Sequence, residues 1–284
     1  MPDRAGGIGA SVRQRLLNLA RARGQPLELL LTRYALERLL HRLSLSPHRE
    51  RFVLKGAMLL AIWFDEPQRA TRDLDLLGFG DAADDALLQA WREIMAMQLD
   101  DGLRFDLKGL RSEAIREQAE YGGARFRTTA ELAGARIPVA IDIGFGDAVE
   151  PGIEDIDLPV LLDLPAPHLR AYSLETVIAE KFHAMVVLGR ANSRMKDYYD
   201  VWMLTNAFEV EPARLRQAIA ATFSRRSTAI PARVPDGLSD AFASDPGKLR
   251  QWDAFAQNLV GPTPGLGQVV SELRQSLAGF LAAK

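Results

Sequence analysis

RFVLKGAMLLAIWFDEPQRATRDLDLLGFG, residues Arg51–Gly80, is the stretch from which the expected fold follows. It contains an apolar run, a Lys-Gly turn, a second apolar run, a basic patch and then Asp-Leu-Asp. Side chains alternate between the two faces of a strand, so a strand here puts Asp73 and Asp75 on one face and Leu74 and Leu76 on the other. Two carboxylates spaced by about 6–7 Å at their Cα atoms can hold one or two hard cations.

The pattern Asp-x-Asp is also common on exposed strands and hairpin ends, where it binds nothing. The surroundings of Asp73 and Asp75 differ, because they are apolar and a charge in a core strand needs a partner. Lys55-Gly56 adds to this, since glycine between an expected strand (51–54) and an expected helix (57–64) lets backbone N–H groups approach a phosphate. Together these features predict a site for a metal-bound nucleoside triphosphate.

A third carboxylate is expected on the second strand of a hairpin. Residues 123–132 and 136–145 alternate as two strands around Ala133-Gly134-Ala135. Asp142 is the charge in the middle of the second strand. Its apolar neighbours alternate with it: Ile137, Val139, Ile141 and Ile143. A buried carboxylate must be paired, hydrogen-bonded or bound to a metal. An edge aspartate facing water is the alternative, and we favour Asp142 as the third carboxylate of the site.

Two helices of the second half carry a lysine and two aspartates. Ser173 is the expected N-cap of LETVIAEKFHAMVVLG, in which Lys181 lies beside the apolar stripe and can extend its ammonium into a polar site. The following helix, DYYDVWMLTNAF, presents Asp197 and Asp200 on one face at i, i+3 spacing. His183, two residues after Lys181, is expected to pack or to lie on the helix surface rather than to catalyse.

Two basic helices are expected before the core. Ser11 is the expected N-cap of the first, which ends at Gly24, and the second runs from about Leu27 to Leu43. Their basic side chains are Arg13, Arg15, Arg21, Arg23, Arg33, Arg38 and Arg42. These helices present either ordinary solvated faces or a basic surface that binds a polyanion. Contacts of the second kind would be salt-sensitive and independent of base sequence.

Composition limits the function classes. A net charge of −2 gives no global nucleic-acid signature, so such contacts would use a local patch. With no cysteine, disulfides, thiol catalysis and cysteine zinc sites are excluded, and the four histidines lack zinc-ligand spacing. The chain has no apolar run of membrane-spanning length and no apolar signal-peptide segment near its beginning, so a cytoplasmic protein without membrane contact is expected.

The chain is expected to divide into three parts. These are N-terminal basic helices (1–50), a core (51–165) and a C-terminal helical domain (166–284). The Pro-rich segment 151–167 is expected to be a loop that crosses between domains. The charged segment 111–121 is expected to be partly helical.

The ordered motifs VLKGA, RATRDLDLL, IPVAIDIGFGD, LETVIAEKFHAMV and RMKDYYDVW resemble those of the AbiEii-type nucleotidyltransferase toxins. That family belongs to the DNA polymerase β-like nucleotidyltransferase superfamily and provides toxins of type IV toxin–antitoxin systems. The resemblance covers about residues 52–204. It implies an α/β (α+β) fold, with a polymerase β-like core around a mixed sheet and a C-terminal helical region.

The resemblance also implies roles for single residues. Its catalytic set is Asp73, Asp75, Asp142, Lys181 and Asp200, and its metal ligands are Asp73, Asp75 and Asp142. Its nucleotide-binding positions are Lys55, Gly56, Ala57, Thr71, Arg72, Lys181 and Asp197. Ala57 stands where the family has a second Gly or Ser, and Thr71-Arg72 stands where it has Ser-Lys. These departures concern the choice of nucleotide, because they change phosphate contacts and leave the carboxylates in place.

The activity implied by the resemblance is transfer of a nucleoside monophosphate from an NTP, with Mg²⁺ or Mn²⁺ as cofactor and pyrophosphate as leaving group. The implied acceptor is the 3′ end of tRNA, whose modification inhibits translation, and the implied partner is a cognate antitoxin. Two alternatives stay open. The same chemistry could act on a protein or a small molecule, or the chain could be a catalytically silent NTP- or RNA-binding protein. Labelled NTP distinguishes these possibilities, because the label would appear on tRNA, on protein or on neither.

Overall fold

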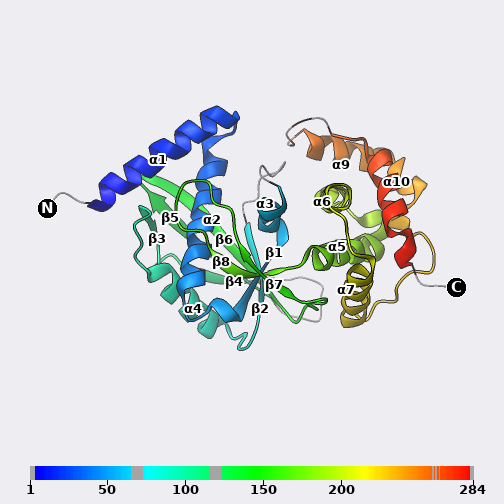
Figure 1. The fold of residues 1–284 in the computed structure, drawn as a ribbon, viewed down its shortest axis with the longest axis horizontal. Helices are drawn as coiled ribbons and strands as arrows, with labels where there is room; N and C mark the ends of the chain where they lie inside the picture. Colours follow the sequence, from blue (N-terminus) through cyan, green and yellow to red (C-terminus); the bar gives the residue numbers. More distant parts are fainter. Residues whose placement is uncertain are drawn as a thin grey trace. The chain divides into compact units, whose positions relative to one another are not determined.

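The computed structural model describes residues 4–64, 73–115, 123–257, 259, 261 and 263–281 (Figure 1). The chain forms two compact units. The first comprises Met1–Gly146 and Glu154–Ala171, and the second comprises Asp147–Ile153 and Tyr172–Lys284. Among the described residues, no helix combines the length and the apolar character that crossing a bilayer requires.

In the described residues, eight strands form one sheet in the order β3-β5-β6-β2-β1-β8-β7, with β4 also paired to β5. Their bounds are β1 Phe52–Lys55, β2 Asp73–Gly78, β3 Leu103–Phe105, β4 Arg111–Ile115, β5 Gly123–Leu132, β6 Ala135–Phe145, β7 Ile153–Asp157 and β8 His168–Tyr172. Strand β2 is antiparallel to β1 and parallel to β6, and β1 is parallel to β8. The expected mixed sheet is therefore confirmed.

The expected hairpin is also confirmed, as β5 and β6. Leu132 pairs with Ala135, so the turn between the strands consists of Ala133 and Gly134. Both turn residues have positive φ, 45° and 80°, as a two-residue turn that matches strand twist requires. Every second side chain of the hairpin is buried, and those between are half-buried or exposed. The sheet therefore has one apolar face and one polar face in this region.

Helices cover the apolar face of the first unit. They are α1 Arg4–Arg23, α2 Leu27–Leu45 and α4 Asp84–Ala96, while η2 Gly56–Leu59 and α3 Leu60–Trp63 follow β1. Helix α2 packs on β6 and on α1, and α4 packs on α2, β3 and β4 (Figure 1). The buried stripe of α4 includes the expected Trp91, Ile94 and Met95. The helices leave the polar side chains of β5 and β6 on the other face.

The expectation for the N-terminal helices is wrong in two respects. Helix α1 begins at Arg4, well before Ser11, although Gly24 ends it with a φ of +61° as expected. Arg38 and Arg42 were expected to add surface charge, yet their exposed fractions are 2% and 1%. The positive surface of these helices therefore loses two arginines.

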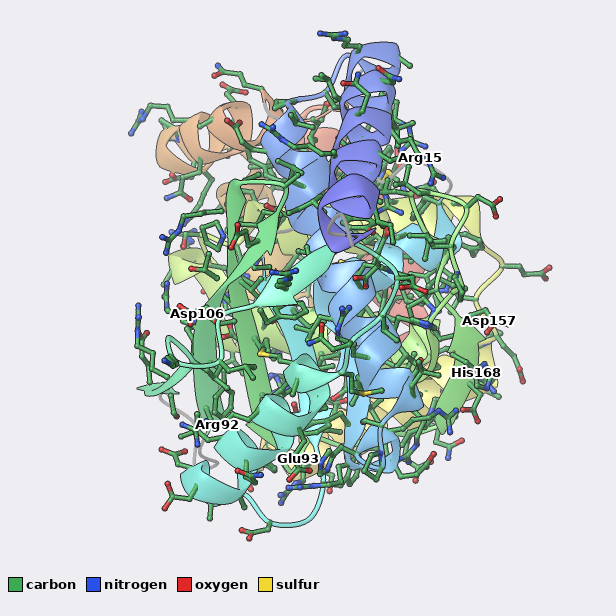
Figure 2. The ribbon with its side chains drawn as sticks, turned by 90° about the vertical axis from the view of Figure 1, so that its left-hand side faces the viewer. Arg15, Arg92, Glu93, Asp106, Asp157 and His168 are labelled. Carbon is green, nitrogen blue, oxygen red and sulfur yellow. The ribbon has the colours of Figure 1, made fainter. Side chains whose placement is uncertain are left out.

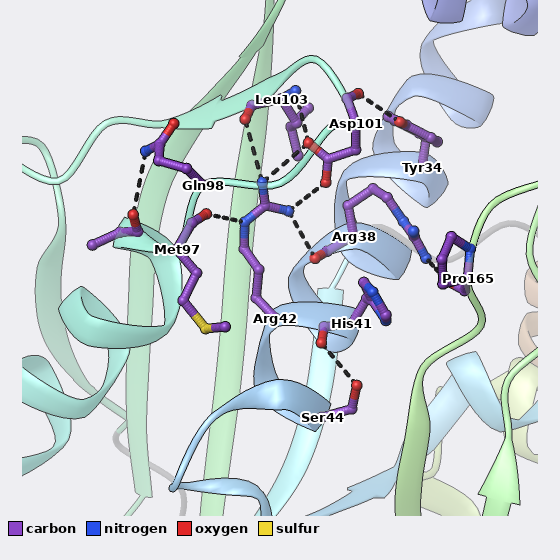
Figure 3. A network of polar contacts seen from close by, with 11 residues as sticks. Tyr34, Arg38, His41, Arg42, Ser44, Met97, Gln98, Asp101, Leu103 and Pro165 are labelled. Atoms are coloured by element: carbon purple, nitrogen blue, oxygen red, sulfur yellow. Dashed lines mark hydrogen bonds and ion pairs between the residues drawn. The ribbon is translucent and has the colours of Figure 1, made fainter.

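The burial of Arg38 and Arg42 is explained by the network in Figure 3. Arg42 donates from Nη1 to Asp101 Oδ2 at 2.6 Å, from Nη2 to Oδ1 at 3.1 Å and from Nε to the Met97 carbonyl at 3.0 Å. Arg38 Nη2 donates to the Pro165 carbonyl at 2.7 Å. A buried guanidinium is tolerated when carboxylate or carbonyl oxygens accept its hydrogen bonds. Here Arg42 joins α2 to the loop that contains Met97 and Asp101, and Arg38 joins α2 to the loop that contains Pro165.

Two segments expected to lack strands contain one each. In the segment 111–121, Arg111 to Ile115 form β4 and pair antiparallel with β5, and residues 116–121 lie outside the described part of the chain. The Pro-rich segment 151–167 crosses from the second unit to the first, but it includes a strand, β7, beside β8 and is not all loop. Asp157 of β7 contacts His168 of β8, with 2.9 Å between Oδ1 and Nδ1 (Figure 2).

The second unit is helical in its described residues, as expected for the C-terminal region. Its helices are α5 Leu174–Leu188, α6 Met195–Ala207, α7 Pro212–Arg225, α8 Asp240–Ala243, α9 Pro246–Ala256 and α10 Leu266–Leu277. Ser173 caps α5 as expected, because its side chain accepts a hydrogen bond from the Thr176 N–H. Aromatic pairs fill the core, including Phe182 with Phe223 at 5.6 Å between ring centroids.

Candidate active site

The strand aspartates share the polar face of the sheet. Asp75 of β2 pairs with Asp142 of the parallel strand β6, so their side chains lie side by side. Asp73 lies two residues earlier on the same face, while Leu74 between them is fully buried. The local geometry expected from the sequence is thus present, because the apolar residues of β2 enter the core and leave the carboxylates on the other face.

Gly56 sets the space in which the Asp75 side chain lies. Lys55 pairs with Asp75 across β1 and β2, and Gly56 follows with a φ of +73°. A Cβ atom on Gly56 would lie 2.1 Å from Asp75 Oδ2 and 2.7 Å from Cγ. Ala57 continues the same turn into η2. The glycine therefore permits both the backbone conformation and the close approach of the carboxylate.

Asp142 is paired with an arginine that was not identified from the sequence. Arg125 of β5 lies opposite Asp142, with Nε donating to Oδ1 at 2.5 Å and Nη2 donating to Oδ2. The hydrogen bonding to Asp142 raises the pKa of Arg125, and the charge of Asp73 adds to this. The hairpin carried the signal, because a two-residue turn after Leu132 fixes Arg125 as the partner of Asp142.

The cross-strand pairs form a row of charges, which we call the charge row. It consists of Lys55, Asp75, Asp142, Arg125 and Glu113, on β1, β2, β6, β5 and β4. Two carboxylates stand in its middle with a cationic residue on each side. A row that contains three carboxylates and two cationic residues offers groups of both signs, one for a cation and one for a phosphate.

The remaining expected residues lie in the second unit. Lys181 of α5 places Nζ 2.6 Å from Asp197 Oδ1 and 3.0 Å from Asp200 Oδ2, both on α6. The two aspartates share one helix face as expected, and Asp200 is only 1% exposed. Thus Lys181 contacts Asp197 and Asp200 in the second unit, whereas Asp73, Asp75 and Asp142 share one face of the sheet in the first. Thr71 and Arg72 lie outside the described residues.

The strand site fits a divalent cation that arrives with its substrate. Among the described residues, no three Asp, Glu, His or Cys side chains converge in a preformed metal site. Mg²⁺, however, is usually held by one or two carboxylates, with phosphate and water oxygens completing its shell. Asp73 and Asp75, two residues apart on one strand face, would be such a pair. The oxygens of Asp142 retain lone pairs beyond those that accept from Arg125.

Comparison with known proteins identifies the class. The chain belongs to the AbiEii family, described as nucleotidyl transferase AbiEii toxins of type IV toxin–antitoxin systems, whose model matches residues 38–276. It is therefore a nucleotidyltransferase, a toxin that uses an NTP and has an antitoxin as its partner. The family predicted from the sequence motifs is confirmed.

Two solved structures from Helicobacter pylori are similar to this chain. One is a candidate nucleotidyltransferase, with 15% identity, 86% of this chain and 94% of that chain covered, and a TM-score of 0.47. The other is JHP933, with 14% identity, 85% and 93% covered, and a TM-score of 0.40. No curated protein matches the chain.

Proposed function

We propose that this enzyme is Mg²⁺-dependent, with Mn²⁺ as a substitute, and transfers a nucleoside monophosphate from an NTP to the 3′ end of tRNA, which inhibits translation. The observation that carries the proposal is the pairing of Asp75 with Asp142 on one sheet face, with Asp73 beside them. Neighbouring carboxylates repel each other and have little value for stability, whereas they suit a site that receives a cation.

The residues of this chain have separate roles in the proposed reaction. Bound Mg²⁺ supplies charge neutralisation for the triphosphate and acidifies the acceptor hydroxyl. Asp73, Asp75 and Asp142 would hold it, and the resemblance assigns the triphosphate to Lys181. The acceptor oxygen bonds to the α-phosphorus as the bond to the bridging oxygen breaks. Pyrophosphate leaves with the electron pair, and the hydroxyl proton passes to Asp142 or Asp200.

The turn after β1 completes the proposed nucleotide site. Lys55, Gly56 and Ala57 would contact the phosphates, and the family resemblance assigns nucleotide binding to Thr71, Arg72 and Asp197 as well. At Gly56 the absence of a side chain brings the backbone close to the Asp75 carboxylate and so to the place where phosphate and cation would meet.

A polyanionic acceptor is supported by the first helix. Arg13, Arg15 and Arg21 of α1 are exposed, and Arg15 is labelled in Figure 2. Contacts between exposed arginines and RNA phosphates do not depend on base sequence. Such contacts therefore suit tRNA as acceptor, because different tRNAs differ in base sequence but have the same phosphate backbone and the same kind of 3′ end.

The test is a transfer assay with the full chain, Mg²⁺, each labelled NTP in turn and total tRNA. Asp73→Ala is the matched variant, because Asp73 is exposed and its loss leaves the core intact. We expect label on tRNA with the wild type, and none with the variant or after chelation. A fully active Asp73→Ala protein would overturn the site. Label on protein or on a small molecule, with none on tRNA, would replace the proposed acceptor.

A further inference from the structure

We propose that Arg125 binds a phosphate group of the substrate and that Asp142 holds its guanidinium in position for this contact. The inference rests on the proposed nucleotidyl transfer and adds to it a residue and a ligand class. Arg125 would be a binding residue, and Asp142 would act on it as a positioning residue.

The geometry of the pair leaves part of the guanidinium available. Arg125 contacts Asp142 through Nε and Nη2, along one side of the planar group. In the described part of the chain, the hydrogen bonds of Arg125 use neither N–H of Nη1. The side chain is 33% exposed, so a ligand can reach it. Guanidinium binds phosphate well because its N–H groups are fixed in a plane and always charged.

The position of Arg125 in the charge row relates it to the carboxylates. It is separated from Asp75 by Asp142 alone, and Lys55 lies at the other side of Asp75. A phosphate that bridges to a cation at Asp73 and Asp75 therefore has a guanidinium two strands away, on β5. Strands lie about 4.8 Å apart, so the backbone positions are about 10 Å apart, and the Arg125 side chain covers part of that distance because it already extends to Asp142 on the strand between.

Stability alone is a weak reason for this pair. A partly exposed ion pair contributes about 0–1 kcal/mol, because water already solvates both groups. The neighbouring Arg127 shows the ordinary arrangement. It lies opposite Ala140, which pairs with Asp73 on its other side, and its Nε contacts Glu113 at 2.9 Å. Of these two arginines on β5, Arg125 alone is joined to a carboxylate of the proposed site.

The phosphate could belong to the triphosphate of the NTP or to the RNA backbone of the acceptor. Both present the same anionic oxygens to Arg125, so the chemistry of recognition is shared. Separate binding measurements with the two molecules distinguish the sources. A non-hydrolysable NTP analogue with Mg²⁺ reports on the first, and unmodified tRNA without nucleotide reports on the second.

The experiment compares Arg125→Gln, Arg125→Lys and Asp142→Asn in the full chain. Glutamine keeps a hydrogen-bond donor to Asp142 but removes the charge. The control is Arg136→Ala, which removes an exposed arginine from the same strand face, about 20 Å along β6 from Asp142. Calorimetry gives the affinity for the analogue, filter binding gives that for tRNA, and steady-state kinetics give KM and kcat.

We expect Arg125→Gln to weaken binding of one ligand by about 10- to 100-fold, the range for removal of a charged hydrogen bond. Arg125→Lys should recover part of that affinity. Asp142→Asn should raise KM for the same ligand by a smaller factor and should also lower kcat, because Asp142 is a proposed metal ligand and proton acceptor as well. Arg136→Ala should change neither affinity. The ligand affected identifies the source of the phosphate.

Unchanged affinity for both ligands in a folded Arg125→Gln protein would overturn the inference. If Arg125→Gln does not fold, the test uses Arg125→Lys instead. Wild-type affinities for both ligands in that variant would likewise overturn the inference that the guanidinium binds phosphate. The proposed function fails in a different way, when the wild type itself neither binds Mg²⁺–NTP nor transfers label.

Discussion

Gly56 and Asp75 are in such close contact that a single added methyl group would overlap the carboxylate. A Cβ atom on Gly56 would lie 2.1 Å from Asp75 Oδ2, well inside van der Waals contact. The turn after β1 thus limits where the β2 carboxylate can lie. Gly56 was expected to bind phosphate through its backbone. It also determines the position of Asp75, a proposed metal ligand.

We predict that Gly56→Ala lowers nucleotidyl transfer by about 100-fold, because displacing a catalytic group by about 1 Å has an effect of that size. The variant should also lose about 1–2 kcal/mol of stability, since alanine must adopt a φ of +73°. Initial rates of transfer and the free energy of unfolding in urea measure the two effects.

Gly80→Ala is the matched control for Gly56→Ala. Gly80 has a φ of +81°, yet no atom lies within 4 Å of its added Cβ. This variant shares the backbone strain and lacks the collision, so it should lose similar stability and retain activity. Equal rates for the two variants would contradict a role for Gly56 in placing Asp75.

We predict that Lys181→Met destabilises the second unit by about 3–5 kcal/mol, the usual effect of removing one partner of a buried ion pair. The change takes away the ammonium shared by Asp197 and Asp200, which are 7% and 1% exposed. Asp197→Asn keeps the contact between Lys181 and Asp200 and should be milder. Thermal and urea unfolding compare them, and equal losses of stability would argue against the shared ammonium.

The strand positions of Asp73 and Asp75 could be predicted because apolar alternation is a local property of the sequence. Leu74 and Leu76 are fully buried, so the alternation determines which face the aspartates occupy. Local patterns also predicted the hairpin and the cap at Ser173. The fold of the core thus follows largely from short-range periodicity and from the family motifs.

What could not be predicted depends on partners distant in sequence. Arg42 looks like a surface residue of a basic helix until Asp101, in a loop beyond β2 and α4, supplies its carboxylate. Arg125 can be identified as a residue of the site only once the hairpin register places it opposite Asp142. The role of Arg42 requires a pairing that no local pattern contains, whereas that of Arg125 requires the exact register of the hairpin.

We predict that Arg15→Ala and Arg21→Ala each reduce the salt dependence of tRNA binding. Both residues are exposed on α1, and removing one arginine–phosphate interaction changes the slope of log K against log salt by about 1. Arg92→Ala, which removes an exposed arginine of α4, is the control and should leave the slope unchanged (Figure 2). Wild-type slopes in both α1 variants would exclude this helix from the RNA interface.

We predict that His183 makes the stability of the second unit depend on pH. The pKa of His183 is lowered to about 4, chiefly by burial and also by the Arg226 charge, while the charge of Asp147 opposes the shift. His183 also packs on Phe223, and its Nε2 lies 3.0 Å from Thr228 Oγ1. The fold therefore favours the neutral ring.

Because the pKa is depressed on folding, the contribution of His183 is fully present above about pH 6.5 and is lost as the pH falls towards 4. This decrease in stability reaches up to about 3 kcal/mol. His183→Gln keeps a hydrogen-bonding side chain and removes the titration. Urea unfolding of both proteins at about pH 7.5, 6 and 5 isolates the effect, since their other ionisable groups are the same. The wild type should lose stability faster than the variant on acidification, and a constant difference between them would mean that His183 does not titrate on unfolding.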